Sequence, residues 1–267
     1  MSQKENKKTL NLIWKLARND FKTRYAGSYL GALWAMVQPV VTVLMYYIVF
    51  DKIFQSRAEA VAGDIPIPYV LFLTAGLVPW FYFSEGMSNG ANALIQYSYL
   101  VKKVVFKIDI LPVIKVVAAS FIHIFFLAVL LIIAAIYGFY PNLYSFQLLY
   151  YSFCMFALLL ALAYSTSAIV VFFRDLNQII QIFLQIGMWA TPILWNIGNL
   201  SPTWQTVIKV INPVSYVVLG YRATICESKG FWTDPVYTVY FWGVVLVLFL
   251  IGRGVFKKLK IHFADVL

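Results

Sequence analysis

Charged residues are scarce in this sequence. Asp, Glu, Lys and Arg together make up 12% of its 267 residues, whereas a soluble globular protein carries about 25% because water must solvate its surface. Hydrophobic residues make up 62%. This balance excludes an ordinary soluble domain. Several charge-poor runs reach the roughly 20 residues with which a helix crosses a bilayer core, so we predict an all-α integral membrane protein.

Residues suited to catalysis or metal binding are also few. The two histidines, His123 and His262, and the two cysteines, Cys154 and Cys226, form no cluster with metal-ligand spacing. The cysteines give no sign of a disulfide framework. The sequence contains no phosphate-binding motif of the form G-x-x-x-x-G-K-[ST]. We therefore predict that the chain is not an enzyme and binds no metal or cofactor. We interpret His123 as a packed, hydrogen-bonded residue rather than a proton relay.

Six stretches of the sequence are predicted to span the membrane as helices. They cover residues 30–50, 69–96, 111–137, 146–173, 177–197 and 236–256. The first contains Pro39, which removes a backbone donor, but membrane helices tolerate this when neighbours satisfy the freed carbonyl.

Two further segments are predicted to be helical without crossing the membrane. In residues 7–26, apolar residues recur at three- and four-residue spacing, and basic residues occupy the other faces. The apolar residues are Leu10, Ile13, Trp14, Ala17 and Phe21. This pattern predicts an amphipathic helix in the cytoplasmic headgroup layer, or one packed on a partner. Residues 204–226 are apolar but interrupted by Asn212-Pro213. They predict two short re-entrant helices between the fifth and sixth spans, near a translocation path.

The distribution of basic residues predicts the orientation. Sixteen of the 21 Lys and Arg residues lie in the N-terminal segment, the tail, or the connections after the second and fourth spans, and five lie on the other side. The positive-inside rule therefore places both termini in the cytoplasm. Because the basic residues flank apolar segments and form no separate domain, the net charge of +10 does not indicate nucleic-acid binding.

Polar residues inside two predicted spans are candidates for a functional surface. In the second span Ser84, Ser88, Asn92 and Gln96 recur every four residues beside Glu85, which predicts one continuous polar stripe. A carboxylate at that depth faces water or the protein interior. The stripe is interpreted as the wall of a hydrophilic conduit or a subunit interface, with helix–helix hydrogen bonding as the alternative. The fifth span carries a second stripe, formed by Gln178, Gln181 and Gln185.

The connection between the second and third spans is short, basic and aromatic. Residues 97–109 read YSYLVKKVVFKID. This composition suits a helical projection that docks on a soluble partner, and it equally suits a simple positive-inside anchor.

Motifs along nearly the whole chain resemble those of ABC-2 type permeases, the membrane subunits of exporters for O-antigen, capsule and wall teichoic acid. The resemblance rests on the order and spacing of five blocks. They are RYAGSYLGALWAMVQPV (24–40), AGLVPWFYFSEG (75–86), LVKKVVFKIDILP (100–112), VFFRDLNQIIQIFLQIGMWATPILW (171–195) and INPVSYVVLGYR (211–222).

The resemblance implies a single ABC-2 type transmembrane domain over residues 1–267. Residues 1–29 would form the cytoplasmic interface helix, 30–256 the six spans and 257–267 a cytoplasmic tail. It also implies a bacterial inner-membrane location and a homodimer. Two ATP-binding cassette subunits would bind the ATP and Mg that this chain does not, and the cargo would be a lipid-linked polysaccharide.

Roles for individual residues follow from the same resemblance. Coupling to the ATPase would fall to Tyr99, Leu100, Lys102, Lys103, Phe106 and Lys107. The cytoplasmic gate would be formed by Arg24, Tyr25, Arg174 and Asp175, although Arg174 and Asp175 could equally form a structural ion pair. The stripe and nearby aromatic residues suit a sugar chain, because rings stack on its apolar faces and polar groups bind its hydroxyls. The candidates for the substrate path are Trp34, Trp80, Phe81, Ser84, Glu85, Ser88, Asn92, Gln181, Gln185 and Trp189.

Three other readings stay open. An ABC-2 permease for a drug or a lipid would have a smoother, more apolar path. A membrane-embedded enzyme of glycolipid synthesis would need clustered acidic residues or histidines, whereas Asp51, Glu59 and Asp64 are scattered. A scaffold without transport would produce no response in a partner ATPase.

Overall fold

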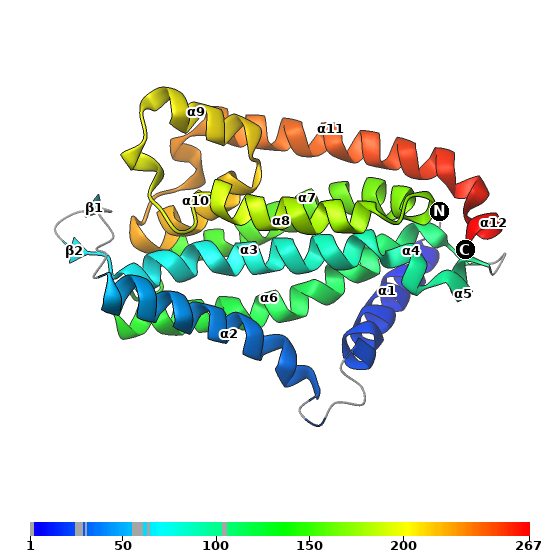
Figure 1. Cartoon of the computed structure of the whole chain (residues 1–267), viewed down its shortest axis with the longest axis horizontal. Coiled ribbons are helices and arrows are strands. Elements are labelled where there is room, and N and C mark those ends of the chain that lie inside the picture. Colours follow the sequence, from blue (N-terminus) through cyan, green and yellow to red (C-terminus); the bar gives the residue numbers. More distant parts are fainter. Residues whose placement is uncertain (1–2, 25–28, 30, 55–60, 63–64, 103–105) are drawn as a thin grey trace.

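The computed structural model describes residues 3–24, 29, 31–54, 61–62, 65–102 and 106–267. Its long helices run side by side along one axis, and both chain ends lie at the same end of the bundle (Figure 1). The long helices are α2 (Trp34–Tyr46), α3 (Tyr69–Ala91), α6 (Leu111–Ile136), α7 (Gln147–Phe172), α8 (Leu176–Ala190) and α11 (Pro235–Leu259). At the opposite end, β1 (Val61–Ala62) and β2 (Ile65–Pro66) pair antiparallel, with Val61 opposite Pro66. The sequence analysis did not predict this hairpin.

Among the residues that the structure describes, four segments are long and apolar enough to cross a membrane. They are Tyr69–Ala91, Ile108–Ile136, Leu143–Phe172 and Pro235–Val266, and they correspond to the second, third, fourth and sixth predicted spans. The prediction of a multi-pass helical membrane protein is confirmed to that extent. The segment of the first predicted span is a shorter apolar helix over Trp34–Phe50.

The fifth predicted span is shorter than expected. The helix α8 ends at Ala190, where Thr191 turns to φ −82° and ψ 138°, so the prediction of a helix to residue 197 is wrong. The physical reason is Pro192, whose ring disfavours the helical conformation at the residue before it. Fifteen residues of helix extend about 22 Å, less than the roughly 30 Å of a hydrocarbon core.

The helix α3 forms the centre of the bundle and packs against α6, α7 and α10 (Val214–Cys226). Small residues allow such close approach between membrane helices. A Cβ at Gly86 would lie 2.6 Å from a methyl carbon of Leu159, and one at Gly252 would lie 2.6 Å from the carbonyl oxygen of Ala161. The glycines therefore set how closely α3 and α11 pack on α7.

The segment before the last span folds as two short helices, as predicted. The helix α9 (Pro202–Ile211) is 10 residues long and α10 is 13. At the break between them, Asn212 accepts a hydrogen bond from the Val214 amide (3.1 Å) and donates one to Thr191 Oγ1 (2.8 Å). Arg222 of α10 is 5% exposed, and its guanidinium donates to the carbonyl oxygens of Phe72, Pro192 and Ile193. This contact fixes the turn after α8 against α3.

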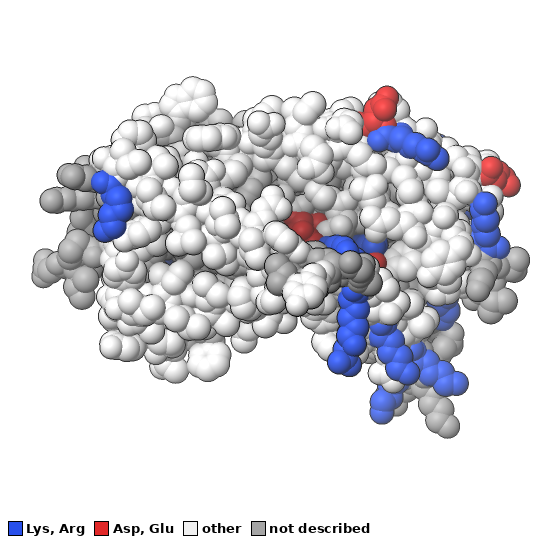
Figure 2. Space-filling model, turned by 60° about the horizontal axis from the view of Figure 1, so that its bottom comes forward, with Lys and Arg blue, Asp and Glu red and all other residues white. Residues whose placement is uncertain are grey.

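The N-terminal helix α1 (Gln3–Arg24) lies across one end of the bundle (Figure 1). Its predicted apolar face is only partly covered. Ala17 is buried and Phe21 contacts Phe121 of α6 at 5.9 Å between ring centroids, whereas Leu10 is 66% exposed. Figure 2 shows Lys and Arg gathered at this end, over α1, while the middle of the molecule carries few charges. This charge asymmetry fits a bundle that crosses a membrane.

Candidate functional site

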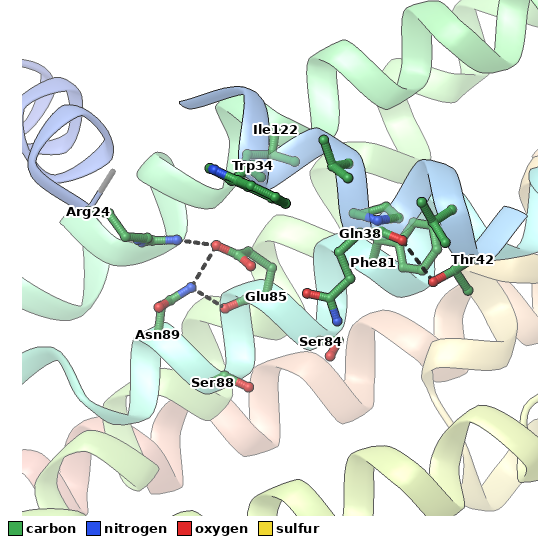
Figure 3. Close-up of a pocket in the computed structure, with 14 residues that line it drawn as sticks. Arg24, Trp34, Gln38, Thr42, Phe81, Ser84, Glu85, Ser88, Asn89 and Ile122 are labelled. Carbon is green, nitrogen blue, oxygen red and sulfur yellow. Dashed lines mark hydrogen bonds and ion pairs between the residues drawn. The ribbon is translucent and has the colours of Figure 1, made fainter. Parts of the chain in front are cut away.

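A pocket of about 760 Å³ opens between α2 and α3 (Figure 3). Its lining combines aromatic, hydroxyl, amide and charged side chains from α1, α2, α3 and α6. The residues labelled in Figure 3 are Arg24, Trp34, Gln38, Thr42, Phe81, Ser84, Glu85, Ser88, Asn89 and Ile122. Five of the ten residues proposed from the sequence for a substrate path therefore share one pocket: Trp34, Phe81, Ser84, Glu85 and Ser88.

Helical spacing explains why these residues meet. On α3, Ser84 and Glu85 follow Phe81 by three and four residues, and Ser88 follows them by four and three, so all lie on one face. On α2, Trp34, Gln38 and Thr42 are four residues apart and oppose that face.

The carboxylate of Glu85 in the pocket wall is compensated. Its carboxylate forms an ion pair with Arg24 and accepts a hydrogen bond from the Asn89 amide at 2.9 Å. The side chains of Arg24 and Glu85 are 22% and 31% exposed, so the pair is reachable from the pocket. A carboxylate paired in this way is tolerated inside a membrane protein.

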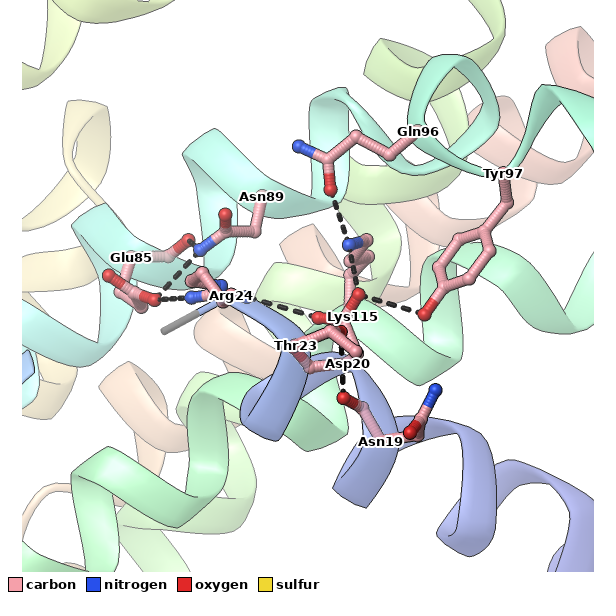
Figure 4. Close-up of polar contacts among 9 residues, drawn as sticks. All are labelled: Asn19, Asp20, Thr23, Arg24, Glu85, Asn89, Gln96, Tyr97 and Lys115. Carbon is pink, nitrogen blue, oxygen red and sulfur yellow. Dashed lines mark hydrogen bonds and ion pairs between the residues drawn. The ribbon is translucent and has the colours of Figure 1, made fainter. Parts of the chain in front are cut away.

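The same arginine joins the pocket to a second, buried ion pair (Figure 4). Arg24 contacts Asp20 at 3.2 Å, and Asp20 also accepts hydrogen bonds from Lys115 of α6 and from the Tyr97 hydroxyl (2.8 Å). Two cations and two carboxylates therefore form a charge-balanced network, called here the Asp20 network, of Asp20, Arg24, Glu85 and Lys115.

The Asp20 network reaches the start of the basic connection. Lys115 is 2% exposed and also donates to Gln96 Oε1. Burial and the hydrogen bond to Asp20 both raise the pKa of Tyr97, so its hydroxyl stays a donor. The network ties α1 to α3, to α6 and to residues 96–97. Sequence reasoning assigned no role to Asp20 or Lys115, although a lysine just inside a span already requires a partner.

The polar stripe of α3 is not continuous, which corrects the prediction. The helix ends at Ala91, and the Asn92 amide donates back to the Ser88 carbonyl oxygen at 2.9 Å. Asparagine side chains compete for backbone groups in this way and interrupt helices. Asn92 instead accepts a hydrogen bond from Asn177 (3.0 Å), and Gln96 turns toward Lys115.

The helix α8 flanks the polar face of α3. Gln181 donates to Ser88 Oγ at 3.0 Å, while Gln178 and Gln185 are exposed. Within α8 only Ile180 and Leu184 are buried. Trp189 is 59% exposed. The helix thus presents a mixed amide and aromatic face away from the bundle.

Trp80 does not line the pocket, contrary to its placement on the substrate path. It is 5% exposed, and a Cβ on Gly187 of α8 would lie 2.9 Å from its ring. It packs between α3 and α8 because the glycine leaves room for the indole.

The residues proposed for coupling and for the cytoplasmic gate lie toward the basic end of the helix bundle. The structure brings only some of them close to one another. Lys103 and Tyr25 lie outside the described residues. Tyr99, Lys102 and Lys107 are exposed, while Leu100 and Phe106 are half-buried against an apolar cluster that includes Ala17 and Leu111. The expected projection over 97–109 contains helix α5 (Ser98–Val101) and a 3-10 turn over Ile108–Ile110.

Arg174 and Asp175 lie in the turn between α7 and α8, and both are exposed. Among the described contacts they form no ion pair with each other, so the alternative of a structural ion pair is not supported. Among the described ion pairs, neither is joined to Arg24, which belongs to the Asp20 network.

His123 has the packed environment expected from the sequence. It stacks on Tyr82 at 4.4 Å between ring centroids, and Nε2 lies 2.9 Å from Ser152 Oγ. Among the described residues, no group of three or more His, Cys, Asp or Glu side chains could hold a metal ion.

Comparisons with known proteins agree with this architecture. Residues 11–226 match the family model described as ABC-2 type transporter. The chain is 26% identical over 261 residues to an O-antigen export system permease protein RfbA of Klebsiella pneumoniae, covering 96% of this chain and 95% of that protein. It is 27% identical over 256 residues to the protein of that name from Myxococcus xanthus, covering 95% and 94%.

Proposed function

Because the chain belongs to the ABC-2 type transporter family, we propose that it is the membrane subunit of an ATP-driven polysaccharide exporter. Its cargo would be a lipid-linked polymer of the O-antigen, capsule or teichoic acid type, moved across the bacterial cytoplasmic membrane. Relatives along almost the whole chain carry the name O-antigen export permease. The observation that carries the proposal is the pocket between α2 and α3.

The lining of this pocket suits a sugar chain. Trp34 and Phe81 offer ring faces for the apolar faces of sugars, and Ser84, Ser88 and Gln38 offer partners for hydroxyl groups. The Arg24–Glu85 pair leaves the wall without net charge, so the contacts that the wall offers a cargo are mainly ring, hydroxyl and amide contacts. A permease for an apolar drug or lipid, the first alternative, would not need this row of hydroxyl and amide groups.

In the proposed arrangement six segments cross the membrane, with both termini in the cytoplasm. The helix α2 contains 13 residues, and the helical segment η2 (Tyr47–Ile53) that follows it contains 7. Together the two segments extend about 30 Å. The helix α8 and the turn after it would complete the fifth crossing. The basic end of the bundle would face the cytoplasm by the positive-inside rule.

A second copy of the chain would cover the exposed face of α8. Three glutamines and Trp189 on this short helix lie open, although amide groups are poorly solvated by lipid. A homodimer would place two such faces, and the two pockets beside them, along one conduit.

Two ATPase subunits would dock at the basic end and bind ATP and Mg there. Residues 97–109 are proposed as the coupling segment, because Tyr99 of α5 and Lys102, directly after that helix, are exposed. The Asp20 network gives this segment a physical link to the pocket, since Tyr97 bonds Asp20 and Arg24 joins Asp20 to Glu85.

The decisive experiment is ATP hydrolysis by the purified chain and its ATPase in lipid. We expect a stable complex whose hydrolysis responds to this subunit. Lys102→Ala/Phe106→Ala should abolish the response, whereas Lys229→Ala, at an exposed site outside this segment, should keep it. Unchanged hydrolysis in the double variant would reject the coupling assignment. Failure to form a complex with any ATPase would reject the exporter and favour a membrane-embedded glycolipid enzyme.

A further inference from the structure

A second pocket, of about 490 Å³, opens at the end of the bundle that holds both termini. The exporter proposal assigns it no role. Its polar lining comes from α11, from the turn that follows it, from α7 and from the 3-10 turn before α6, with Asp109, Tyr164, Arg253, Lys257 and Lys260 as the polar members.

The pocket is cationic. Arg253, Lys257 and Lys260 are spaced by four and three residues, which puts them on one helical face. Lys260 pairs with Asp109 at 2.6 Å. Among the described contacts, Arg253 and Lys257 form no ion pair with a carboxylate. Three cations against one carboxylate leave the pocket with a net charge of +2.

An aromatic wall and an open backbone position adjoin these cations. The guanidinium carbon of Arg253 lies 6.0 Å from the Tyr164 ring centroid and 5.9 Å from that of Phe249. A Cβ on Gly254, also in the lining, would have no atom within 4 Å. A ligand can therefore approach the helix backbone beside Arg253.

The same face of α11 becomes apolar one turn further into the bundle. Leu246 and Leu250 lie seven residues before Arg253 and Lys257, so they share their face. They are 58% and 61% exposed. An acidic groove on a soluble protein would match the cations but not this apolar continuation, whereas a phospholipid matches both.

We propose that this pocket binds the phosphate headgroup of an anionic phospholipid. Arg253 and Lys257 contact the phosphate oxygens, and an acyl chain lies along Leu246 and Leu250. The site is separate from the pocket between α2 and α3, so it does not depend on which cargo the protein exports.

Adjacent lysines on α11 provide a matched test. Lys257 lines the pocket, whereas Lys258 is exposed at the same depth but points from another face. Native mass spectrometry of the purified chain would measure binding of phosphatidylglycerol against phosphatidylcholine. Each charge contact contributes about fivefold in affinity. We expect Lys257→Ala to weaken phosphatidylglycerol binding about fivefold and Arg253→Ala/Lys257→Ala roughly 25-fold, with Lys258→Ala unchanged.

Three results would overturn the proposal. Equal losses in Lys257→Ala and Lys258→Ala would mean that general surface charge attracts the lipid. Equal binding of phosphatidylcholine would remove the requirement for an anionic headgroup. Displacement of phosphatidylglycerol by excess inorganic phosphate, with phosphate then bound, would make free phosphate the ligand. Because the variants change exposed side chains, retention of the intact folded chain in the same spectra checks their integrity.

Discussion

Lys115 of α6 and Asp20 of α1 form an ion pair in which the lysine side chain is 2% exposed and the aspartate 9%. The pair joins the first helix of the chain to the interior of the bundle. It is also the part of the Asp20 network most shielded from solvent.

Removal of one member of this pair should destabilise the protein strongly. We expect Lys115→Ala to cost about 3 kcal/mol, because it leaves the Asp20 carboxylate buried without its main cation. The paired change Asp20→Asn/Lys115→Met should recover part of this loss, since no uncompensated charge remains. Thermal unfolding in detergent followed by size-exclusion chromatography measures both. If the double variant is no more stable than Lys115→Ala, the pair is not the source of the stability.

A tryptophan in the pocket should affect export more than an equally exposed tryptophan elsewhere. Trp34 is 51% exposed in the pocket, and Trp232 is 59% exposed outside it. We expect Trp34→Ala to reduce polymer export roughly two- to tenfold through lost ring contacts. Surface polymer on cells carrying each variant is the measurement. A similar reduction in Trp232→Ala would argue against a specific role for the pocket.

Two glycines of α11 should respond oppositely to alanine. At Gly252 the added methyl group meets the Ala161 carbonyl oxygen at 2.6 Å, whereas at Gly243 it meets no atom within 4 Å. Gly252→Ala should destabilise the protein by about 1–3 kcal/mol, because α11 must move away from α7. Gly243→Ala should leave stability unchanged or raise it slightly through helix propensity. Chemical denaturation in mixed micelles distinguishes the two, and equal effects would contradict the close approach at Gly252.

Arg222 should not be replaceable by lysine. Its guanidinium serves three carbonyl oxygens, two of them in the turn after α8. An ammonium group lacks the planar fork that reaches all three. We expect Arg222→Lys to loosen this turn and increase protease cleavage within residues 191–200. Lys229→Arg, at an exposed site, serves as the control. Unchanged cleavage in Arg222→Lys would show that the turn is held by other contacts.

The sequence predicted the spans with long apolar runs well, because hydropathy and length determine them. The break at Asn212-Pro213 was also predictable, since proline has a local effect. The end of α8 was missed although Pro192 marks it, because the apolar pattern continues beyond the proline. For the pocket, helical spacing correctly predicted that Ser84, Glu85 and Ser88 lie on one face of α3.

Sequence spacing could not place Trp80 or Asn92. Trp80 points to Gly187 rather than to the pocket, and Asn92 ends its helix by bonding Ser88. The position of Trp80 depends on the room that Gly187 of the neighbouring helix leaves for its ring. The position of Asn92 depends on the Ser88 carbonyl oxygen that accepts its hydrogen bond. The partnership of Asp20 and Lys115, 95 residues apart, likewise needs the tertiary arrangement.

The Arg222 contact also has a consequence for biogenesis. Its partner carbonyl at Phe72 lies 150 residues earlier in the chain. A ribosome adds about 5–20 residues per second, so α3 waits roughly 8–30 s for this arginine to be synthesised. During that interval the first turn of α3 lacks the guanidinium that later joins it to α10 and to the turn after α8. This arginine contact can therefore form only after α3, the turn after α8 and most of α10 have all been synthesised.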